Sequence, residues 1–497
     1  MTETPIAAPG LHERFLRGLA RSPHRTALCA DGESLTYEAL HALALRRAGA
    51  LAADGSPVVA VLADKGVTAY AGILAALYAG ATVVPLNPRF PAERTRSMLS
   101  AAGAGAVVAD DTGRAALART ELDLPVLPEG APLNAPAVVR PSDVAYVLFT
   151  SGSTGRPKGV PVTHAANQHY FGLLDARYDF APDDVFSQYF GLSFDCAMFE
   201  LFCAWGHGAA VHPVPPAAHR DLPAFVAERR MTVWFSVPSG IALTRQMGGL
   251  PPGSMPSLRW SFFAGEALLC ADAADWQAAA PRSQVENLYG PTELTITVSG
   301  HRWSPGTSAA LAVNGVVPIG RIHAGHEIFL DSGRDAQGTS AREGELCVSG
   351  PQLTPGYLDP EDDAGRFFER DGRRWYRTGD RVRLLDDGEL LYLGRIDSQV
   401  QIQGFRVELA EVDHAVRQCP GVTNAATVTR PAPSGGLELL VYYTGDRVHP
   451  AVLRRELSTR LPEAMLPKAY RHLPEFPLNA NRKIDRRKLA GEAARNG

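Results

Sequence analysis

Residues 150–159 (TSGSTGRPKG) follow the apolar run 144–149 (VAYVLF) and combine hydroxyl groups, glycines and two cations. Backbone N–H groups of such a loop, together with side-chain hydroxyls and a lysine, can wrap a polyphosphate. The Walker A spacing G-x-x-x-x-G-K-[ST] is absent, so this is a phosphate loop of another kind. A plain surface turn is the alternative. The composition favours phosphate binding, which we assign to Thr150, Ser151, Gly152, Ser153, Thr154, Gly155 and Lys158.

The cysteines do not indicate metal or disulfide chemistry. All six are scattered, with no C-x-x-C pair and no histidine cluster at metal-ligand spacing. Reduced thiols in a cytoplasmic protein are the simplest interpretation. The N-terminal segment lacks the basic start and continuous apolar stretch of a signal peptide, and no window of 18 uncharged apolar residues occurs.

The segments around the loop alternate between strand-like and helix-like patterns. Residues 57–63 read as a buried strand, 67–80 as a helix closed by a glycine, and 81–87 as the next strand. A second such stretch runs from 183 to 290, whereas 315–393 is richer in short strands and turns. We therefore expect an α/β fold with mostly parallel sheets flanked by helices, plus a β subdomain.

The last hundred residues carry a separate small pattern. Helical periodicity occurs at 407–419 and again at 450–461, with strand-like runs between them. This change of pattern predicts a large N-terminal domain of residues 1–396 and a small α+β C-terminal domain of residues 397–497.

Length and charge agree with a protein of two domains that acts on small molecules. The 497 residues exceed the size, roughly 250–300 residues, at which a single core stops growing. Lys and Arg number 49 against 53 Asp and Glu, which leaves no basic footprint for nucleic acid or an anionic membrane.

At this point the sequence resembles the adenylate-forming superfamily, which includes nonribosomal peptide synthetase adenylation domains, acyl-CoA ligases and firefly-type luciferases. Besides the loop at 150–159, six segments carry the resemblance in the family's order over almost the whole chain: 35–40 (LTYEAL), 287–293 (NLYGPTE), 344–348 (GELCV), 376–380 (YRTGD), 394–397 (GRID) and 481–485 (NRKID). The resemblance implies ATP and Mg²⁺ as cofactors.

Residue types agree with the nucleotide roles that the resemblance implies. In Asn287-Leu288-Tyr289-Gly290-Pro-Thr292-Glu293 the Gly and Pro shape a tight turn, and the Tyr289 ring offers a face for adenine. The Thr292 hydroxyl can bond a phosphate, and the Glu293 carboxylate is a hard oxygen ligand suited to Mg²⁺. Asp380 would bond the ribose, assisted by Tyr392 and Arg395; a turn-capping aspartate is the alternative.

Lys483 matches the lysine that, in the family, bridges the substrate carboxylate and the α-phosphate. Without the resemblance it would be interpreted as a solvated tail charge. Such a cation can stabilise the charge that develops during attack on phosphorus. Asp397 matches the hinge about which the family's mobile C-terminal domain rotates. Gln401 and Gln403 stand where the family commonly has basic residues, which weakens any inference about nucleotide affinity or the thioester-forming conformation, though not about the fold.

Asp195 matches the aspartate of amino-acid adenylation domains, whose carboxylate pairs with the α-ammonium group of the substrate. The alternative is a helix N-cap, because an amphipathic helix follows. Alignment on this residue and on 289–293 predicts that the side-chain pocket consists of Cys196, Phe199, Phe235, Phe262, Ala264, Leu288 and Ile296, although the aromatic members could equally be ordinary core residues. A crowded, uncharged pocket favours a small neutral amino acid, alanine first and glycine next.

The resemblance therefore implies an amino-acid adenylating ligase. It would form aminoacyl-AMP from ATP with release of pyrophosphate, then load the phosphopantetheine thiol of a carrier protein. The chain ends soon after Lys483 and shows no Gly-Gly-x-Ser carrier segment, so we expect a freestanding enzyme similar to alanine–carrier protein ligases. Two alternatives remain open: an acyl-CoA ligase of the same fold, and a nucleotide-binding regulatory protein without catalysis.

Overall fold

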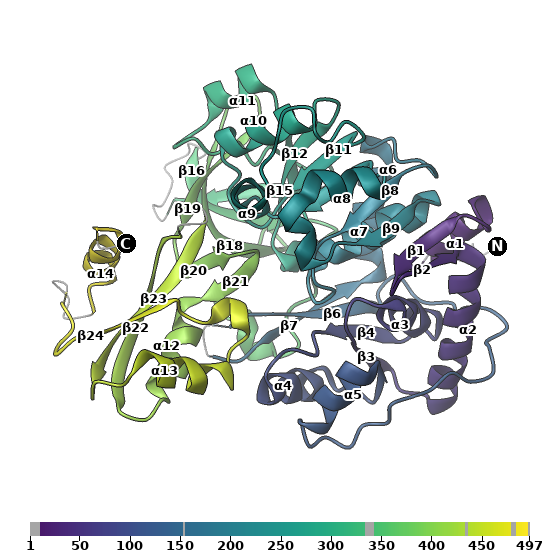
Figure 1. Ribbon diagram of the computed structural model, residues 1–497, viewed down its shortest axis with the longest axis horizontal. Coiled ribbons are helices and arrows are strands. Elements are labelled where there is room, and N and C mark those ends of the chain that lie inside the picture. The colour runs from purple at the N-terminus through teal and green to yellow at the C-terminus, as the bar shows by residue number, and fades with distance from the viewer. Residues whose placement is uncertain (1–9, 153–154, 333–341, 433–435, 479–483, 496–497) are drawn as a thin grey trace.

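The computed structural model describes residues 10–152, 155–332, 342–432, 436–478 and 484–495 (Figure 1). Within these ranges no helix is both long and apolar enough to cross a membrane. The fold contains two mostly parallel sheets, an antiparallel sheet and a smaller C-terminal part (Figure 1).

A five-stranded sheet leads into the phosphate loop. Its strands, in spatial order, are β5 (Ala106–Ala109), β3 (Val58–Leu62), β4 (Thr82–Leu86), β6 (Val144–Thr150) and β7 (Lys158–Thr163). Only the β6–β7 pair is antiparallel. The predicted β-α-β unit is confirmed, since α3 (Val67–Tyr78) connects β3 and β4. The other helices of this region are α2 (Tyr37–Asp54), α4 (Ala92–Ala102) and α5 (Asp111–Ala118).

A nine-stranded sheet carries the predicted substrate residues. Its spatial order is β14 (Arg321–Ile322), β13 (Ser299–Arg302), β12 (Gln284–Tyr289), β11 (Trp260–Phe263), β10 (Val233–Ser236), β8 (Val185–Gln188), β9 (Ala210–Pro213), β1 (Thr26–Ala30) and β2 (Glu33–Thr36). The central strands, from β12 to β1, are parallel. Parallel strands need crossover connections, which here are mostly helical. The accompanying helices are α1 (Glu13–Arg21), α6 (His164–Arg177), α7 (Asp195–His207), α8 (Leu222–Glu228), α9 (Ser239–Met247), α10 (Cys270–Ala279) and α11 (Pro305–Leu311).

The expected β subdomain is a five-stranded antiparallel sheet. It consists of β15 (Glu327–Asp331), β16 (Glu343–Ser349), β17 (Phe367–Arg370), β18 (Arg373–Leu384) and β19 (Leu390–Arg395). Its neighbours pair antiparallel throughout.

We call residues 397–495 the C-terminal lobe. A hairpin opens it, formed by β20 (Gln399–Ile402) and β21 (Phe405–Glu408). A three-stranded sheet follows, with β22 (Val422–Pro431), β23 (Leu437–Gly445) and β24 (Ala469–His472), and with helices α12 (Leu409–Arg417), α13 (Pro450–Ser458) and α14 (Arg486–Arg495). The helix predicted over 407–419 therefore starts two residues late, because Val407 and Glu408 pair in β21 with the preceding strand.

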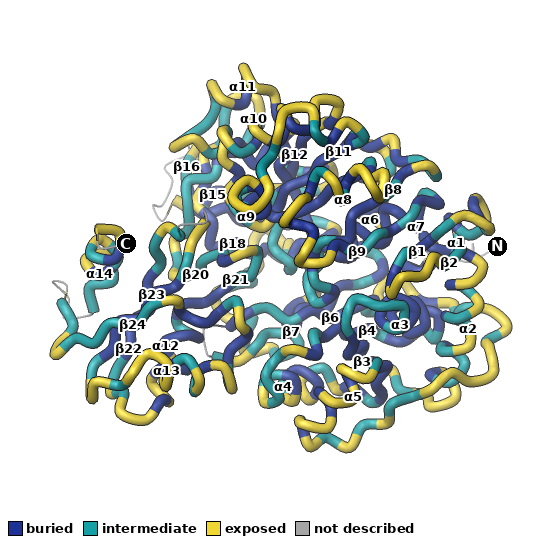
Figure 2. Tube along the Cα trace, viewed as in Figure 1, coloured by how far each residue is buried: buried dark blue, intermediate teal, exposed yellow. Residues whose placement is uncertain are grey.

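The C-terminal lobe has hydrophobic clusters that are separate from those of the rest of the molecule. The two hydrophobic clusters of the lobe contain only residues from 400 onward, so it has a core of its own. The larger clusters lie around the two mostly parallel sheets, whose strands are dark in Figure 2 while the outer faces of the helices are exposed.

Candidate functional site

The loop predicted to bind phosphate leaves the end of β6 and returns at the start of β7, where Thr150 pairs with Lys158. Ser151 donates a hydrogen bond through Oγ to the carbonyl oxygen of Arg406 (2.7 Å), so the loop touches the C-terminal lobe. The Lys158 ammonium forms an ion pair with Asp362 (3.2 Å) and lies 5.0 Å from the centre of the Tyr357 ring. Ser153 and Thr154 lie outside the described residues.

Glu293 is fully buried at the centre of the site. Its Oε1 accepts a hydrogen bond from the Tyr357 hydroxyl (2.6 Å), and Arg406 donates from Nη1 to both carboxylate oxygens (3.1 and 2.8 Å). Burial opposes ionisation, but the Arg406 charge and the Tyr357 hydroxyl outweigh it and hold the pKa of Glu293 below its ordinary value. Glu293 is therefore an ionised carboxylate that already has a cationic partner.

Asp380 lies within β18, and its carboxylate joins two of the residues predicted to bind the nucleotide. The Tyr289 hydroxyl donates to Oδ2 (2.6 Å) and Arg395 donates to Oδ1 (2.8 Å). The turn-capping alternative is wrong, because the carboxylate bonds these side chains and not a turn. Burial raises the pKa of Asp380 despite the nearby Arg395. Tyr392 is close enough to Asp380 that this carboxylate, after burial, helps to raise its pKa.

Two other predicted nucleotide residues have internal partners. The Asn287 amide donates to the carbonyl oxygens of Val317 (3.3 Å) and Pro318 (2.9 Å), so it holds a neighbouring segment in place. Gly290 is required for close packing, because a Cβ atom there would lie 2.5 Å from the Cα of Thr297.

Asp195 is the first residue of α7, and the N-cap is Phe194, which makes no side-chain cap hydrogen bond. The N-cap alternative for Asp195 is therefore wrong by one residue. Burial raises the pKa of Asp195 to about 6, although hydrogen bonds from the Thr292 hydroxyl and from Cys196 act in the opposite direction. The carboxylate is thus desolvated and oriented, and Thr292 links it to the 287–293 segment.

The seven predicted pocket residues lie in one buried cluster. This cluster is the main hydrophobic core. Within it three phenylalanine rings pack together, with centroids 4.8 Å apart for Phe199 and Phe235, 5.2 Å for Phe199 and Phe262, and 6.1 Å for Phe235 and Phe262. The other four members belong to the same cluster and are at most 8% exposed: Cys196, Ala264, Leu288 and Ile296. Residues separated by up to a hundred positions in the sequence are thus brought together beside Asp195.

The hairpin of the C-terminal lobe is inserted into this site. The amide of Gly404 at its tip donates to Glu266 Oε1 (2.8 Å), and the Phe405 ring meets the Phe194 ring edge-on at 4.8 Å. On the other side of the loop, Arg94 and Glu411 form a buried ion pair (2.5 Å). Sequence reasoning did not assign Glu266 or Arg406; the available signal was their position in the segments FAGE (263–266) and GFRVE (404–408).

Asp397, the predicted hinge residue, is held by two arginines. Arg395 binds both carboxylate oxygens (2.7 Å each), and Arg366 lies 3.2 Å away. Burial opposes ionisation, but these partners keep the pKa of Asp397 below its usual range.

Lys483 lies outside the described residues. The nearest described residues on either side of it, Leu478 and Ile484, pair in an isolated β-bridge. Ile484 packs beside β22 and β23, and α14 lies at the edge of the molecule, on the side of the C-terminal lobe remote from β6 (Figure 1).

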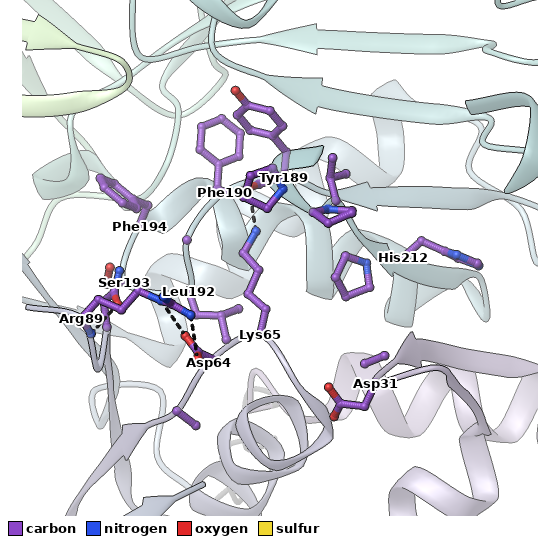
Figure 3. Close-up of a pocket in the computed structure, with 18 of the residues that line it drawn as sticks. Asp31, Asp64, Lys65, Arg89, Tyr189, Phe190, Leu192, Ser193, Phe194 and His212 are labelled. Atoms are coloured by element: carbon purple, nitrogen blue, oxygen red, sulfur yellow. Dashed lines mark hydrogen bonds and ion pairs between the residues drawn. The ribbon is translucent and has the colours of Figure 1, made fainter. Parts of the chain in front are cut away.

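A cavity of about 1060 Å³ lies beside Phe194, between the part of the chain that precedes residue 397 and the tip of the β20–β21 hairpin. Figure 3 shows Arg89 paired with Asp64 in its wall, and Lys65 reaching the backbone of Tyr189. The wall combines apolar, basic and acidic side chains, among them Phe190, Phe194, Val237, Phe405, Arg89, Arg229, Asp31 and Asp64.

A magnesium ion would find one carboxylate here. Among the described residues, no three histidine, cysteine, aspartate or glutamate side chains gather closely enough to hold a metal. Mg²⁺ in nucleotide enzymes is often bound by one or two carboxylates together with substrate phosphates. Glu293, beside the phosphate loop, fits that pattern, provided that Arg406 withdraws.

The sequence profile for "AMP-binding enzyme" matches residues 15–358, more than half of the chain. The chain belongs to this family. The predicted resemblance to adenylate-forming enzymes is therefore confirmed, and so is the expected class of adenylating enzyme at the level of the family.

The similarity between this AMP-binding enzyme and its relatives covers nearly the full length of the chain. It is 31% identical to an L-proline--[L-prolyl-carrier protein] ligase of Pseudomonas fluorescens, covering 97% of this chain and 98% of the relative. The crystal structure of IdnL7 shares 52% identity and a TM-score of 0.76, covering 98% of this chain and 99% of that one. The Vibrio cholerae adenylation domain AlmE, solved with glycyl-adenosine-5'-phosphate, shares 29% identity and a TM-score of 0.85 over 99% of both chains.

The chain spans only 8 to 46% of the length of four larger curated relatives, which are bacterial peptide synthases and synthetases that it matches at 31 to 34% identity. The expected α/β fold is confirmed by the solved structures.

Proposed function

We propose that this chain activates a small neutral amino acid, alanine first and glycine next, as aminoacyl-AMP. It then transfers the aminoacyl group to the phosphopantetheine thiol of a carrier protein. The observation that carries the proposal is the desolvated Asp195 carboxylate beside a cluster of three phenylalanines. Among the described residues no cation pairs with Asp195, and a desolvated carboxylate left without a cation is costly. An α-ammonium group would supply the missing charge.

The pocket supports a short side chain. The three rings contact one another at 4.8 to 6.1 Å between centroids, which leaves little room between them, and none of the seven residues is charged. A hydrophobic pocket discriminates against an extra methylene by about 1–3 kcal/mol, so discrimination against larger residues depends on this packing. The glycyl-adenylate bound to AlmE and the carrier ligase among the relatives agree with the proposed reaction.

In the first half-reaction, the substrate carboxylate attacks the α-phosphorus of ATP, the bond to the β-phosphate oxygen breaks, and pyrophosphate leaves. Loop residues 150–158 would hold the phosphates, Asp380 the ribose and Tyr289 the adenine. Lys483 would neutralise the charge shared by the attacking carboxylate and the α-phosphate. A magnesium ion on Glu293 would supply further neutralisation of the phosphates when bound.

In the second half-reaction, a thiolate attacks the acyl carbonyl carbon, a C–S bond forms, and AMP leaves with the electron pair of the broken C–O bond. The cavity beside Phe194 provides a route for a long, thin arm. The apolar side chains in its wall suit the pantetheine chain, and Arg229, together with the Asp64-paired Arg89, suits the phosphate.

The arrangement of the hairpin suggests that the structure represents the second half-reaction. Arg406 is paired with the carboxylate that we assign to Mg²⁺. Ile484 packs beside β22 and β23, and α14 lies on the side of the lobe remote from β6 (Figure 1). We propose that residues 397–497, which include the C-terminal lobe, rotate about Asp397 to deliver Lys483 for the first half-reaction.

The proposal is tested by exchange of labelled pyrophosphate into ATP. Asp195→Ala should lower amino-acid-dependent exchange by about a hundredfold or more, and Lys483→Ala should abolish it. Asp221→Asn, which removes a charge at the exposed N-cap of α8, is the control and should not change exchange. Unchanged exchange in Lys483→Ala would falsify the mechanism. Retained activity of Asp195→Ala with a fatty or aryl acid would favour the acyl-CoA ligase alternative.

A further inference from the structure

The turn that follows Glu293 has an unusual backbone. Thr295 and Ile296 both have positive φ, 55° and 69°. Both side chains are β-branched, for which this left-handed region is strongly disfavoured. Such conformations persist only where the surroundings impose them, and they concentrate at functional sites.

The side-chain amide of Gln352 supplies that constraint. Its Nε2 donates to the carbonyl oxygens of Leu294 (2.9 Å), Thr295 (3.1 Å) and Thr297 (2.9 Å). In return, Thr295 Oγ1 donates to the backbone carbonyl of Gln352 (2.7 Å). Gln352 is fully buried, so no water competes for these bonds. One amide thus holds three peptide carbonyl groups of the turn, on both sides of Ile296.

The turn joins two parts of the site. At its start is Glu293, whose carbonyl oxygen accepts a hydrogen bond from the amide of Thr354 (2.9 Å), two residues after Gln352. In its middle is Ile296, which lies 1% exposed in the cluster that contains the three phenylalanines. The side-chain direction of Ile296 depends on φ at residues 295 and 296, because each backbone rotation moves its Cβ relative to the sheet.

We propose that Gln352 is a positioning residue that determines the size of the amino-acid pocket by holding Ile296 in a conformation that its own backbone preference opposes. Gln352 does not touch the substrate. This inference rests on the proposed function for its link to specificity, and on the hydrogen bonds alone for its link to backbone order. It predicts that loss of the Gln352 amide enlarges the amino-acid pocket and changes the binding of ATP much less.

The first test is the substrate selectivity of Gln352→Met, which preserves side-chain length and removes both N–H donors. We expect the ratio of kcat/KM for alanine over that for leucine to fall about fivefold or more, with less than about a threefold change in KM for ATP. Gln352→Glu, which keeps the shape but directs an oxygen at the carbonyls, should act in the same direction. It replaces Gln352→Met if that protein does not fold.

Thr354→Val is the matched control. Its hydroxyl is buried in the same segment but bonds the carbonyl oxygens of Pro161 and Gly356, not the turn. Selectivity in Thr354→Val should equal that of the wild type. A wild-type ratio in both Gln352 variants, or an equal change in Thr354→Val, would overturn the proposal.

Hydrogen–deuterium exchange separates this inference from the proposed function. Peptides that cover 294–298 should exchange about tenfold faster in Gln352→Met, while peptides from β10 and β11 stay unchanged. Unchanged exchange at 294–298 overturns the inference even if the enzyme is active. Failure of the wild type to activate any amino acid would overturn the proposed function, and the exchange rates would still decide whether Gln352 orders the turn.

Discussion

At the scale of single residues, the site depends on two carboxylates with different partners, the fully buried Glu293 and the half-buried Asp195. Glu293 is paired with Arg406 and is ionised. Asp195 accepts hydrogen bonds from Thr292 and Cys196, and desolvation, together with the nearby Glu293 charge, raises its pKa to about 6. The ionised Glu293 carboxylate suits the binding of a metal cation that arrives with the nucleotide. The Asp195 carboxylate suits a substrate that carries a positive charge.

The pH dependence of amino-acid capture follows from the pKa of Asp195. The carboxylate must be ionised to pair with an ammonium group, so kcat/KM for the amino acid should be constant above about pH 6 and fall as the pH drops through about 6. The measurement is pyrophosphate exchange at limiting amino acid and saturating ATP. A profile that stays flat down to pH 5 would contradict the assignment, because an ordinary aspartate titrates near 3.8.

Local motifs made most of these residues predictable, since the loop residues and 287–293 are contiguous in the sequence. Arg406 and Glu266 were missed for a physical reason. Arg406 lies 113 residues from Glu293, and the amide of Gly404 lies 138 residues from Glu266. Sequence pattern alone does not give contacts that depend on how the lobe is docked.

At the scale of elements, the hairpin β20–β21 connects the lobe to the site. Its tip residues, Gln403 and Gly404, both have positive φ (51° and 80°), as a two-residue hairpin turn of type I′ requires. Its strands orient Arg406 toward Glu293 and Phe405 toward Phe194. Periodicity predicted the helix after it but not the strand β21, because four residues are too few to show an alternating pattern clearly.

Gly404→Ala should block seating of the hairpin. A Cβ at this position would lie 2.6 Å from Val237 Cγ1, and φ is +80°. We expect thioester formation to fall about tenfold or more while pyrophosphate exchange stays within about threefold of wild type. Gly388→Ala is the matched control, since φ there is +86° but nothing lies within 4 Å. An equal loss of thioester formation in both variants would mean that backbone strain causes the effect, and it would contradict the role of Gly404 in docking the hairpin.

Arg406→Gln should separate the two half-reactions. Loss of the guanidinium leaves Glu293 without its cation in the docked state, so thioester transfer should decrease about tenfold or more. Exchange should be retained, because the first half-reaction requires Arg406 to leave Glu293. Arg430→Gln, which breaks the Arg430–Glu438 pair within the β22–β23 sheet, is the control. The assignment fails if Arg406→Gln loses exchange but keeps transfer from preformed aminoacyl-AMP.

At the scale of the whole molecule, the lobe has its own core, and it contacts the preceding part of the chain through polar and aromatic pairs such as Gly404–Glu266, Arg94–Glu411 and Phe405–Phe194. The α/β class was predictable from the β-α-β rhythm, whereas the division into domains of residues 1–396 and 397–497 stays a prediction. The orientation of the lobe was not predictable, because it depends on long-range pairs such as Arg94–Glu411.

A disulfide can test whether this orientation must change during the reaction. A Cβ at Gly436 would lie 3.6 Å from the Cβ of Ser239, within the range for a disulfide. Ser239→Cys combined with Gly436→Cys should, when oxidised, lower exchange about tenfold or more and recover with reductant. Each single variant is a control. Full exchange in the oxidised double variant would contradict rotation of the lobe.

The most direct test of the central claim is pyrophosphate exchange of the wild-type chain across the common amino acids. We expect alanine to give the highest exchange and glycine the next highest, and large or charged amino acids to give little. Best exchange with a large or charged amino acid, with alanine and glycine inactive, would contradict the claim that Asp195 and the three phenylalanines form a pocket for a small neutral amino acid.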